Sequence, residues 1–328
     1  MPRETLGFGG EKNAYTSDYS ILCCPMPFVS VVIPTFNRPA LLRQTLDSVC
    51  RQTYRDFEII VVDDSSALTK AESVCCKVPQ CRYLCAKHLG RSDARNYGLR
   101  AATGELYALV DDDDLWKPDK LARQVAFLDK NPDVGLVHSP AELVGIDSLP
   151  TGKVIGANNP EWREGNVFEH AVRRCVVKSP TPVMRRSVFE RVGGFNTQLH
   201  YGEDWEFWAR AAYVTKFGYI ADPLAYYRVH NGSSAGETAV VVKELVKTAI
   251  FMAGTLSRFV RAQDRPIVLR QCCLAYLELI NANAGSCDNA RLAPLGRALR
   301  LWPACLLRRE FWAIVKKGTR PNLWRSRG

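Results

Sequence analysis

The chain has 328 residues, 47% of them hydrophobic and 24% charged, which is the composition of a globular protein with one large structural unit or two. No apolar run approaches the roughly 20 residues that a membrane-spanning helix needs. The net charge of +10 belongs to residues 240–328, where 16 Lys and Arg face 5 Asp and Glu, so the rest of the chain is nearly neutral. A basic tail of this kind suits an anionic surface, either nucleic acid or lipid head groups, or simply a solvated helical face.

The start of the chain and the cysteines bear on the compartment. Residues 1–27 are polar and Gly-rich without the pattern of a signal peptide, and we expect them to form a flexible N-terminal arm. The 12 cysteines contain no Cys-x-x-Cys pair, and their spacing within residues 75–85 matches no usual zinc site. We therefore expect reduced thiols and a cytoplasmic protein.

Strands and helices alternate between residues 28 and 139. Apolar, β-branched runs predict strands, which lie at 28–34, 57–62, 82–85, 106–110 and 134–139. Helical spacing of apolar residues predicts helices between them, at 41–52, 90–102 and 117–130, with a weak one after residue 66. This alternation with short connections predicts an α/β fold, in which a mostly parallel, doubly wound sheet is flanked by helices.

The second half of the chain is less regular. Residues 141–163 are expected to be irregular because they are rich in Gly, Pro and Asn, and residues 180–184 should form a constrained loop or strand. Further elements are predicted in several ranges, with helices at 165–177, 187–192, from 203 onwards, 240–259, 267–280 and 295–315 and a late strand at 224–230. We therefore expect one α/β domain at residues 28–235 and a basic helical C-terminal region at 236–328.

Polar residues follow three of the predicted strands. They are Pro34-Thr35, Asp63-Asp64 and a run of four aspartates at residues 111–114, called the aspartate run below. Because the carboxyl ends of parallel strands border the ligand crevice of such sheets, we expect these residues to meet at one edge. Four adjacent carboxylates repel one another, and their oxygens suit Mg²⁺ or Mn²⁺. The alternatives are a solvated acidic turn for the aspartate run and an Asx turn for Asp63-Asp64.

Short motifs in a fixed order resemble those of family 2 glycosyltransferases. They are PTFNR at 34–38, VDDSS at 62–66, ARNYG at 94–98, the aspartate run with Leu115-Trp116, GGF at 193–195 and EDW at 203–205. The resemblance covers residues 28–234 and implies the Rossmann-like GT-A fold. It also implies an inverting, hexosyltransferase-type enzyme that takes a sugar from a nucleoside-diphosphate donor, with a UDP-type donor favoured.

The same resemblance implies roles for residues on the donor side. Asp64 would accept a hydrogen bond from the imide N–H of a uracil or thymine base. The other contacts would come from Pro34, Thr35 and Arg38 at the base and phosphates, Arg91 and Arg95 at the diphosphate, and Asp111 and Asp112 at the ribose. The alternative for Arg91 is an exposed arginine on a helix.

A divalent cation, Mn²⁺ or Mg²⁺, is also implied by the resemblance. Asp113 would be its first ligand, with Asp111, and His230 would return to the metal or the phosphates. The cation would neutralise the negative charge that develops on the departing diphosphate. We expect Asp114 to cap the following helix instead. A surface histidine with ordinary partners is an equally good interpretation of His230.

On the acceptor side, the resemblance implies that Asp204 is the base that removes the proton from the acceptor hydroxyl. Glu203 and Trp205 would contact the acceptor, whereas Trp208 more simply packs in the core. The alternative for the two carboxylates is capping of a helix N-terminus, where the helix dipole favours negative charge.

Together these expectations predict a metal-dependent glycosyltransferase that acts on a glycan or lipid-linked acceptor in cell-surface polysaccharide biosynthesis. The basic helices would suit peripheral contact with an anionic membrane, on its inner face. One alternative function is a nucleotide-sugar-binding module without turnover. The other is a nucleic-acid-binding protein, suggested only by the basic tail, and the near-neutral body counts against it, so we expect no nucleic-acid partner.

Overall fold

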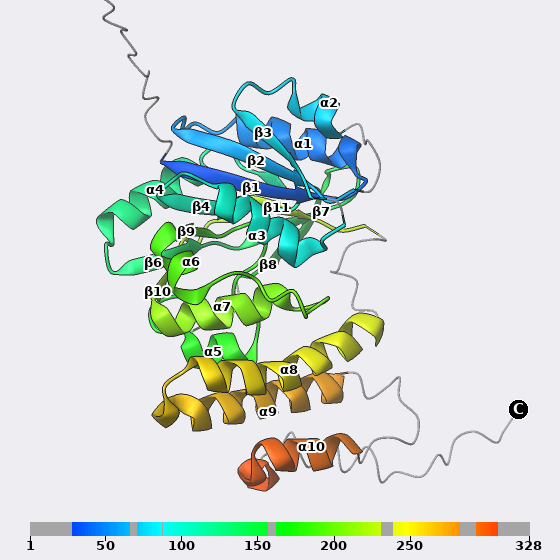
Figure 1. Ribbon diagram of the computed structural model, residues 1–328, viewed down its shortest axis with the longest axis vertical. Coiled ribbons are helices and arrows are strands. Elements are labelled where there is room, and N and C mark those ends of the chain that lie inside the picture. The colour runs from blue at the N-terminus through cyan, green and yellow to red at the C-terminus, as the bar shows by residue number, and fades with distance from the viewer. Residues whose placement is uncertain are drawn as a thin grey trace, which may run out of the picture.

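A seven-stranded sheet forms the centre of the protein, whose computed structural model describes residues 28–65, 71–86, 88–156, 162–230, 239–282 and 293–307 (Figure 1). In spatial order its strands are β10 (Lys216–Tyr219), β6 (Val134–His138), β9 (Val183–Arg185), β4 (Leu106–Leu109), β1 (Val29–Thr35), β2 (Phe57–Asp63) and β3 (Cys81–Cys85). Within this sheet β9 alone runs antiparallel to its neighbours, β4 and β6. The predicted mostly parallel sheet is therefore confirmed.

The register of the central strands brings their polar ends level. In β1 every residue is buried, as expected for a parallel strand covered on both faces. Thr35 at its end pairs with Asp63 at the end of β2, and Val32 pairs with Leu109 at the end of β4. The residues that follow these strands therefore leave the sheet at one edge, as predicted.

Helices cover both faces of the central sheet. Core packing places on one face α1 (Pro39–Cys50), α2 (Ala71–Cys75) and α4 (Lys120–Lys130). The other face carries α3 (Arg91–Ala101), α5 (Phe168–Arg173), α6 (Arg186–Val192) and α7 (Glu203–Val214). Helix α3 lies so close to the sheet that a Cβ atom on Gly98 would come within 2.5 Å of Val32 Cγ1. Glycine at this position therefore permits the approach of α3 to β1.

A second, four-stranded sheet lies beside the aspartate run. Its spatial order is β5 (Leu115–Trp116), β11 (Ala225–Arg228), β7 (Ala141–Val144) and β8 (Pro150–Ile155). The prediction that residues 141–163 are irregular is thus wrong for β7 and β8. The stabilising partner of β7 is β11, which follows some 80 residues later, so local composition could not reveal the strand. Because β5 follows the aspartate run directly and pairs with β11, this sheet holds the run from one side.

Helices α8 (Ala239–Phe259), α9 (Arg265–Ala282) and α10 (Ala293–Leu301) form a layer beyond α5 and α7 (Figure 1). Short 3₁₀ helices at Ala262–Asp264 and Pro303–Leu307 complete it. A third apolar cluster joins this layer to Val172, Trp205 and Ala209 of the α/β part. The predicted helix at 295–315 thus ends early, and residues beyond 307, like the predicted arm at 1–27, lie outside the described residues. A domain boundary near residue 236 stays a prediction.

Two observations concern compartment and membrane. Of the helices in the described ranges, none combines the length and the apolar character needed to cross a bilayer. The nine cysteines in those ranges are all free thiols, as predicted for reduced cysteines.

His138 at the end of β6 should make stability depend on pH. It is fully buried, with Nε2 2.8 Å from the Arg163 carbonyl oxygen and its ring against Phe217 and Tyr219. Burial lowers the pKa of His138 from 6.5 to about 4. Between these values the unfolded chain binds a proton that the folded chain does not, so the free energy of unfolding should fall as pH falls, by about 1.4 kcal/mol per unit.

Urea unfolding across this pH window would test the assignment. The replacement His138→Phe keeps a ring of similar size and removes the titrating group. We expect the variant to lose less stability per pH unit than the native chain. Parallel slopes for the two proteins would show that His138 does not carry the dependence.

Candidate active site

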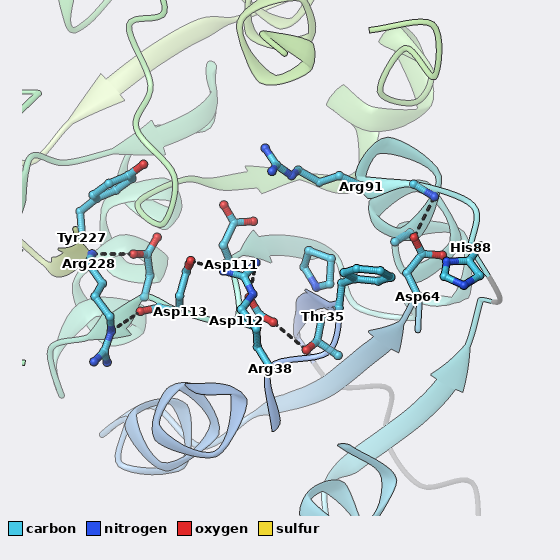
Figure 2. A pocket seen from close by; sticks show the side chains of 15 residues that line it. Thr35, Arg38, Asp64, His88, Arg91, Asp111, Asp112, Asp113, Tyr227 and Arg228 are labelled. Atoms are coloured by element: carbon cyan, nitrogen blue, oxygen red, sulfur yellow. Dashed lines mark hydrogen bonds and ion pairs between the residues drawn. The ribbon is translucent and has the colours of Figure 1, made fainter. Parts of the chain in front are cut away.

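A cavity of about 440 Å³ opens at the edge where β1, β2 and β4 end (Figure 2). It brings together many of the side chains predicted for the donor and the metal, namely Pro34, Thr35, Arg38, Asp64, Arg91, Asp111, Asp112 and Asp113. The remaining lining residues are Phe36, His88, Gly90, Ala94, Asp114, Tyr227 and Arg228. The predicted convergence of three polar loops is therefore present in the structure, whereas the role of each residue stays a prediction.

Two members of the aspartate run point into the protein. Asp112 accepts a hydrogen bond from Thr35 Oγ1 at 2.6 Å, and burial raises the pKa of Asp112 to about 7. Asp114 accepts one from the backbone N–H of Arg228 at 2.9 Å, and burial raises the pKa of Asp114 well above its usual value. The expectation that Asp114 caps the next helix is wrong, because α4 begins only at Lys120. Asp114 instead holds β11 against the aspartate run.

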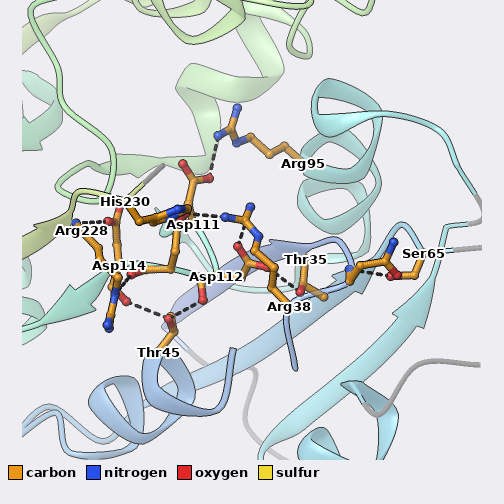
Figure 3. A network of polar contacts seen from close by, with 12 residues as sticks. Thr35, Arg38, Thr45, Ser65, Arg95, Asp111, Asp112, Asp114, Arg228 and His230 are labelled. Carbon is orange, nitrogen blue, oxygen red and sulfur yellow. Dashed lines mark hydrogen bonds and ion pairs between the residues drawn. The ribbon is translucent and has the colours of Figure 1, made fainter. Parts of the chain in front are cut away.

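The other two members of the run face cations (Figure 3). Asp111 Oδ1 lies 2.7 Å from Arg95 Nη2. Burial disfavours the charged form of Asp111, but the Arg95 guanidinium outweighs this and lowers the pKa of the carboxyl. Asp113 Oδ2 lies 2.5 Å from Arg38 Nη1 and 3.0 Å from His230 Nε2. His230 thus contacts Asp113, and its predicted return to the metal or the phosphates stays a prediction.

Arg38 bridges two neighbouring carboxylates of the run. Besides its contact with Asp113, its Nη2 lies 3.0 Å from Asp112 Oδ1. That oxygen is buried and has no partner in hydrogen-bonding geometry among the described residues. An ionic contact without a directed hydrogen bond leaves Asp112 Oδ1 able to accept a further donor or cation. The Arg38 guanidinium therefore offsets the negative charge of both carboxyl groups.

No group of three His, Cys, Asp or Glu forms a ready metal cluster in the part of the chain that the structure describes. The side chains that fit a hard divalent cation best are those of Asp113 and His230, which already meet at 3.0 Å. Asp112 directly precedes Asp113, and its Oδ1 is buried and accepts no hydrogen bond from the described residues. Carboxylate oxygens beside an imidazole nitrogen are a donor set that accepts Mn²⁺ or Mg²⁺.

Arg228 is a residue whose importance sequence reasoning missed. It is fully buried at the end of β11. Its guanidinium donates to four oxygens at 2.6–3.0 Å, those of the Asp113 and Ile146 carbonyls, Ser148 Oγ and Gln44 Oε1. Together with the bond from its N–H to Asp114, these contacts fix the backbone of the aspartate run to β11. The only signal in the sequence is an arginine inside an apolar strand pattern.

Replacing Arg228 with methionine should lower the free energy of unfolding by about 3–5 kcal/mol. The aliphatic side chain fills much of the volume but leaves several buried acceptors unsatisfied. Urea unfolding measures the change. Arg100→Met, on the exposed side of α3, is the control and should stay within about 0.5 kcal/mol of the native chain. Equal stabilities for the two variants would refute the structural role of Arg228.

Asp63 and Asp64 make different contacts. Asp63 Oδ1 accepts the Ser65 N–H at 3.0 Å, which is the Asx turn considered as an alternative. Asp64 faces the cavity, and its two oxygens accept the backbone N–H groups of Leu89 at 2.5 Å and Gly90 at 2.8 Å (Figure 2). These bonds fix the loop between β3 and α3 at the cavity wall. Each Asp64 oxygen retains a second lone pair for a ligand N–H.

A buried ion pair connects α3 with the start of α7. Arg95 Nη1 lies 2.7 Å from Glu203 Oε1, and Arg91 Nη1 lies 3.6 Å from the same oxygen. Gly202, just before the helix, has a φ of +74°, which glycine adopts without strain, and a Cβ there would come 2.9 Å from Thr248 Cγ2 of α8. Arg95 thus joins Asp111 of the cavity to Glu203 of the predicted acceptor side.

Asp204 lies next to this ion pair. It does not line the cavity at the sheet edge, which we call the donor cavity because the residues predicted for the donor line it. It is partly exposed, with Oδ1 accepting the Trp205 N–H at 2.8 Å and Oδ2 lying 3.7 Å from Cys175 Sγ. Burial and the neighbouring Glu203 carboxylate raise its pKa above the usual value. Trp205 is almost buried and donates from Nε1 to the Ala171 carbonyl oxygen at 2.8 Å. Its predicted contact with the acceptor stays a prediction, and Trp208 packs in the core as expected.

Comparison with known proteins places the chain in a family. Residues 30–192 match the family model described as Glycosyl transferase family 2. The uncharacterized glycosyltransferase YwdF of Bacillus subtilis is 30% identical over 194 residues, which cover 56% of this chain and 68% of YwdF. The chain belongs to glycosyltransferase family 2. An uncharacterized glycosyltransferase of Rickettsia felis is 31% identical over 208 residues, covering 63% of the family 2 chain and 34% of the relative. The chain thus spans about a third of the length of its relatives from Rickettsia felis, Rickettsia conorii and Rickettsia bellii.

Solved structures agree on the fold of this family 2 chain. Residues 1–349 of Staphylococcus aureus TarS, in complex with UDP, superpose with a TM-score of 0.64 at 17% identity, covering 88% of this chain and 87% of that one. The mannosyltransferase PcManGT of Pyrobaculum calidifontis, in complex with GDP-Man and Mn²⁺, superposes with a TM-score of 0.57 at 21% identity, covering 89% and 87%. The expected GT-A fold is confirmed.

Proposed function

We propose that this protein is a metal-dependent, inverting glycosyltransferase that moves a sugar from a nucleoside-diphosphate donor to a hydroxyl of an acceptor. The observation that carries the proposal is the single cavity in which Thr35, Asp64 and the aspartate run meet. Family membership supports sugar transfer, and the complexes of TarS with UDP and of PcManGT with GDP-Man support a nucleotide-sugar donor.

The donor side of the mechanism follows from the cavity wall. Asp64 accepts the imide N–H of a uracil base through the lone pairs that Leu89 and Gly90 leave unused. Phe36 and His88, with ring centroids 5.7 Å apart, flank the same part of the cavity. Such recognition by an acceptor-only carboxylate favours uracil, which has an imide N–H, over cytosine, which has none. This supports a UDP-type donor.

Cations around the aspartate run suit the diphosphate. Arg91, half exposed at the cavity wall, is positioned for a phosphate oxygen, and Arg38 is held only by carboxylates. Asp113 and His230 would hold Mn²⁺ or Mg²⁺, with Asp111 and Asp112 close by. A cation bound there supplies Lewis-acid stabilisation of the charge on the departing diphosphate. Arg95 keeps Asp111 ionised and oriented for the ribose or the metal.

Asp204 is the base in this proposal. It follows Glu203, which Arg95 connects to Asp111 of the aspartate run, and it does not line the donor cavity. Its raised pKa increases its affinity for the hydroxyl proton, as a general base requires. The Trp205 N–H and the Cys175 thiol orient the carboxylate. Glu203 holds Arg95 in place and is proposed to contact the acceptor.

The acceptor class is proposed to be a glycan or a lipid-linked sugar used in cell-surface polysaccharide biosynthesis. The basic C-terminal region supports contact with an anionic membrane surface, where a lipid-linked acceptor would be found. Vesicle sedimentation of the full chain with anionic and neutral lipids would test this contact, and equal binding to both would refute it.

A panel of nucleotide sugars tests the donor assignment by thermal shift, with and without Mn²⁺. We expect a UDP sugar to raise the melting temperature, and the gain to grow when Mn²⁺ is present, because a cation held by Asp113 would offset the charge of the diphosphate. GDP and CMP sugars serve as controls. A panel in which no donor raises the melting temperature would refute the proposed function.

A further inference from the structure

A second cavity, of about 530 Å³, lies between the α/β part and the C-terminal helices. Its walls come from residues 173–178 after α5, from Trp205 of α7, and from α8 and α9, which lie beside α5 and α7 in Figure 1. It shares no lining residue with the donor cavity. It is therefore a separate site, bounded by a part of the chain outside the matched family region.

The second cavity is strongly cationic. Its described lining includes four basic side chains, those of Arg163, Arg173, Arg174 and Lys178, and Glu278 as the carboxylate. Glu278 pairs with both Arg173 and Arg174, the latter at 3.0 Å. Lys178 Nζ donates to the Cys175 carbonyl oxygen at 3.1 Å. Arginine forks and a lysine point charge at one cavity are suited to a phosphate group.

The second cavity also adjoins the proposed base. Cys175 belongs to its lining, and Cys175 Sγ lies 3.7 Å from Asp204 Oδ2. Trp205, directly after Asp204, forms another part of the wall. A molecule in this cavity lies beside Cys175, which contacts Asp204, and Trp205, which follows it, so one of its hydroxyls can reach the proposed base.

Aromatic and apolar groups share the cavity with the cations. The Arg174 guanidinium lies 4.9 Å from the ring centroid of Trp162, and Leu245 and Leu279 form an apolar wall. Flat aromatic and aliphatic surfaces suit the apolar faces of a sugar ring, while the cations suit an attached anion. We propose that this cavity binds the phosphate of the acceptor, so that the acceptor is a phosphate-bearing saccharide. The assignment of the ligand as acceptor rests on the proposed function.

Isothermal titration of the full chain with glucose 6-phosphate, farnesyl phosphate and glucose tests the proposal, with UDP present to occupy the donor cavity. We expect glucose 6-phosphate, which carries both the sugar and the phosphate, to bind and glucose not to bind. Binding of farnesyl phosphate without binding of glucose 6-phosphate would overturn the assignment of the ligand as a saccharide. Arg174→Gln and Lys178→Gln, made separately, should each weaken binding about tenfold by removing a charged donor.

Matched controls separate this proposal from the donor assignment. Arg100→Gln, on the exposed face of α3, should leave phosphate binding unchanged. Binding that is unaffected by both Arg174→Gln and Lys178→Gln, in variants with native melting temperatures, would overturn the proposal, as would equal binding of glucose. UDP affinity is measured in the same samples, so a chain that binds a phosphate but no donor refutes the proposed function and not this cavity.

Discussion

Asp204→Asn should lower kcat for sugar transfer by a factor of about 10² to 10⁴, while the Kd for UDP stays unchanged. Asparagine has the shape of aspartate and keeps an oxygen that can accept the Trp205 N–H, which Asp204 Oδ1 accepts at 2.8 Å. It has no carboxylate to take the proton of the acceptor hydroxyl. Because Asp204 is not part of the donor cavity, nucleotide binding has no reason to change.

The pH profile sharpens this prediction. Transfer requires the ionised form of Asp204, so kcat should rise with pH on an acid limb set by its pKa. Burial and Glu203 raise that pKa above the usual carboxyl value, and the limb should be displaced to higher pH accordingly. In Asp204→Asn the limb should vanish together with the activity. Asp119→Asn, at an exposed aspartate before α4, serves as the control. Native kcat in Asp204→Asn would rule out the assignment as base.

The central sheet could be predicted from sequence because its signals are local. Strands β1, β2 and β4 are continuous apolar runs that end in polar residues, so the chain itself marks both the strand and its end. Their parallel pairing then places Thr35, Asp64 and the aspartate run at one edge. The strands that escaped prediction, β5, β7, β8 and β10, are short and partly exposed. Strands β5 and β7 pair with β11 and β10 pairs with β6, partners distant in the sequence that no local pattern reveals, whereas β8 pairs with the neighbouring β7.

The different contacts of the four aspartates in the run also could not be predicted from the sequence. Four identical residues carry no information about which of them faces the ligand. The structure separates them within a turn, in which the Asp114 N–H donates to the Asp111 carbonyl oxygen at 3.2 Å: Asp112 and Asp114 are buried, whereas Asp111 and Asp113 are partly exposed. The resemblance favoured Asp113 as metal ligand through its D-x-D spacing with Asp111, and this role stays a prediction. It misassigned Asp114, whose partner Arg228 lies more than 100 residues later.

The proposed base and the second cavity could not be recognised from local sequence either. Asp204 begins a helix, and an acidic residue there is ordinary capping unless the tertiary structure shows what faces it. Its neighbours come from other elements, Arg95 from α3 and Cys175 from the segment after α5. From the sequence alone, the basic residues 173 and 174 are indistinguishable from exposed surface charges. The tertiary structure places Glu278 of α9 in contact with both.

Asp113→Asn should abolish the part of UDP binding that depends on Mn²⁺. An amide oxygen is a weaker ligand than a carboxylate, and the substitution removes the charge that faces Arg38 and His230. We expect the ratio of UDP affinities with and without Mn²⁺ to fall by about tenfold or more, since even residues that only support a metal ligand often contribute that much. Isothermal titration of UDP in both conditions measures this ratio, independently of any acceptor.

Asp114→Asn is the matched control, because it makes the same chemical change one residue away. Burial raises the pKa of Asp114 well above its usual value, and the amide oxygen of asparagine can still accept the Arg228 N–H that Asp114 accepts. The Mn²⁺ dependence of UDP binding should therefore survive in Asp114→Asn. If both variants lose it, the effect comes from disruption of the aspartate run as a whole. If neither variant loses it, Asp113 is not the metal ligand, and the exposure of an aspartate in the run does not show whether it binds the metal.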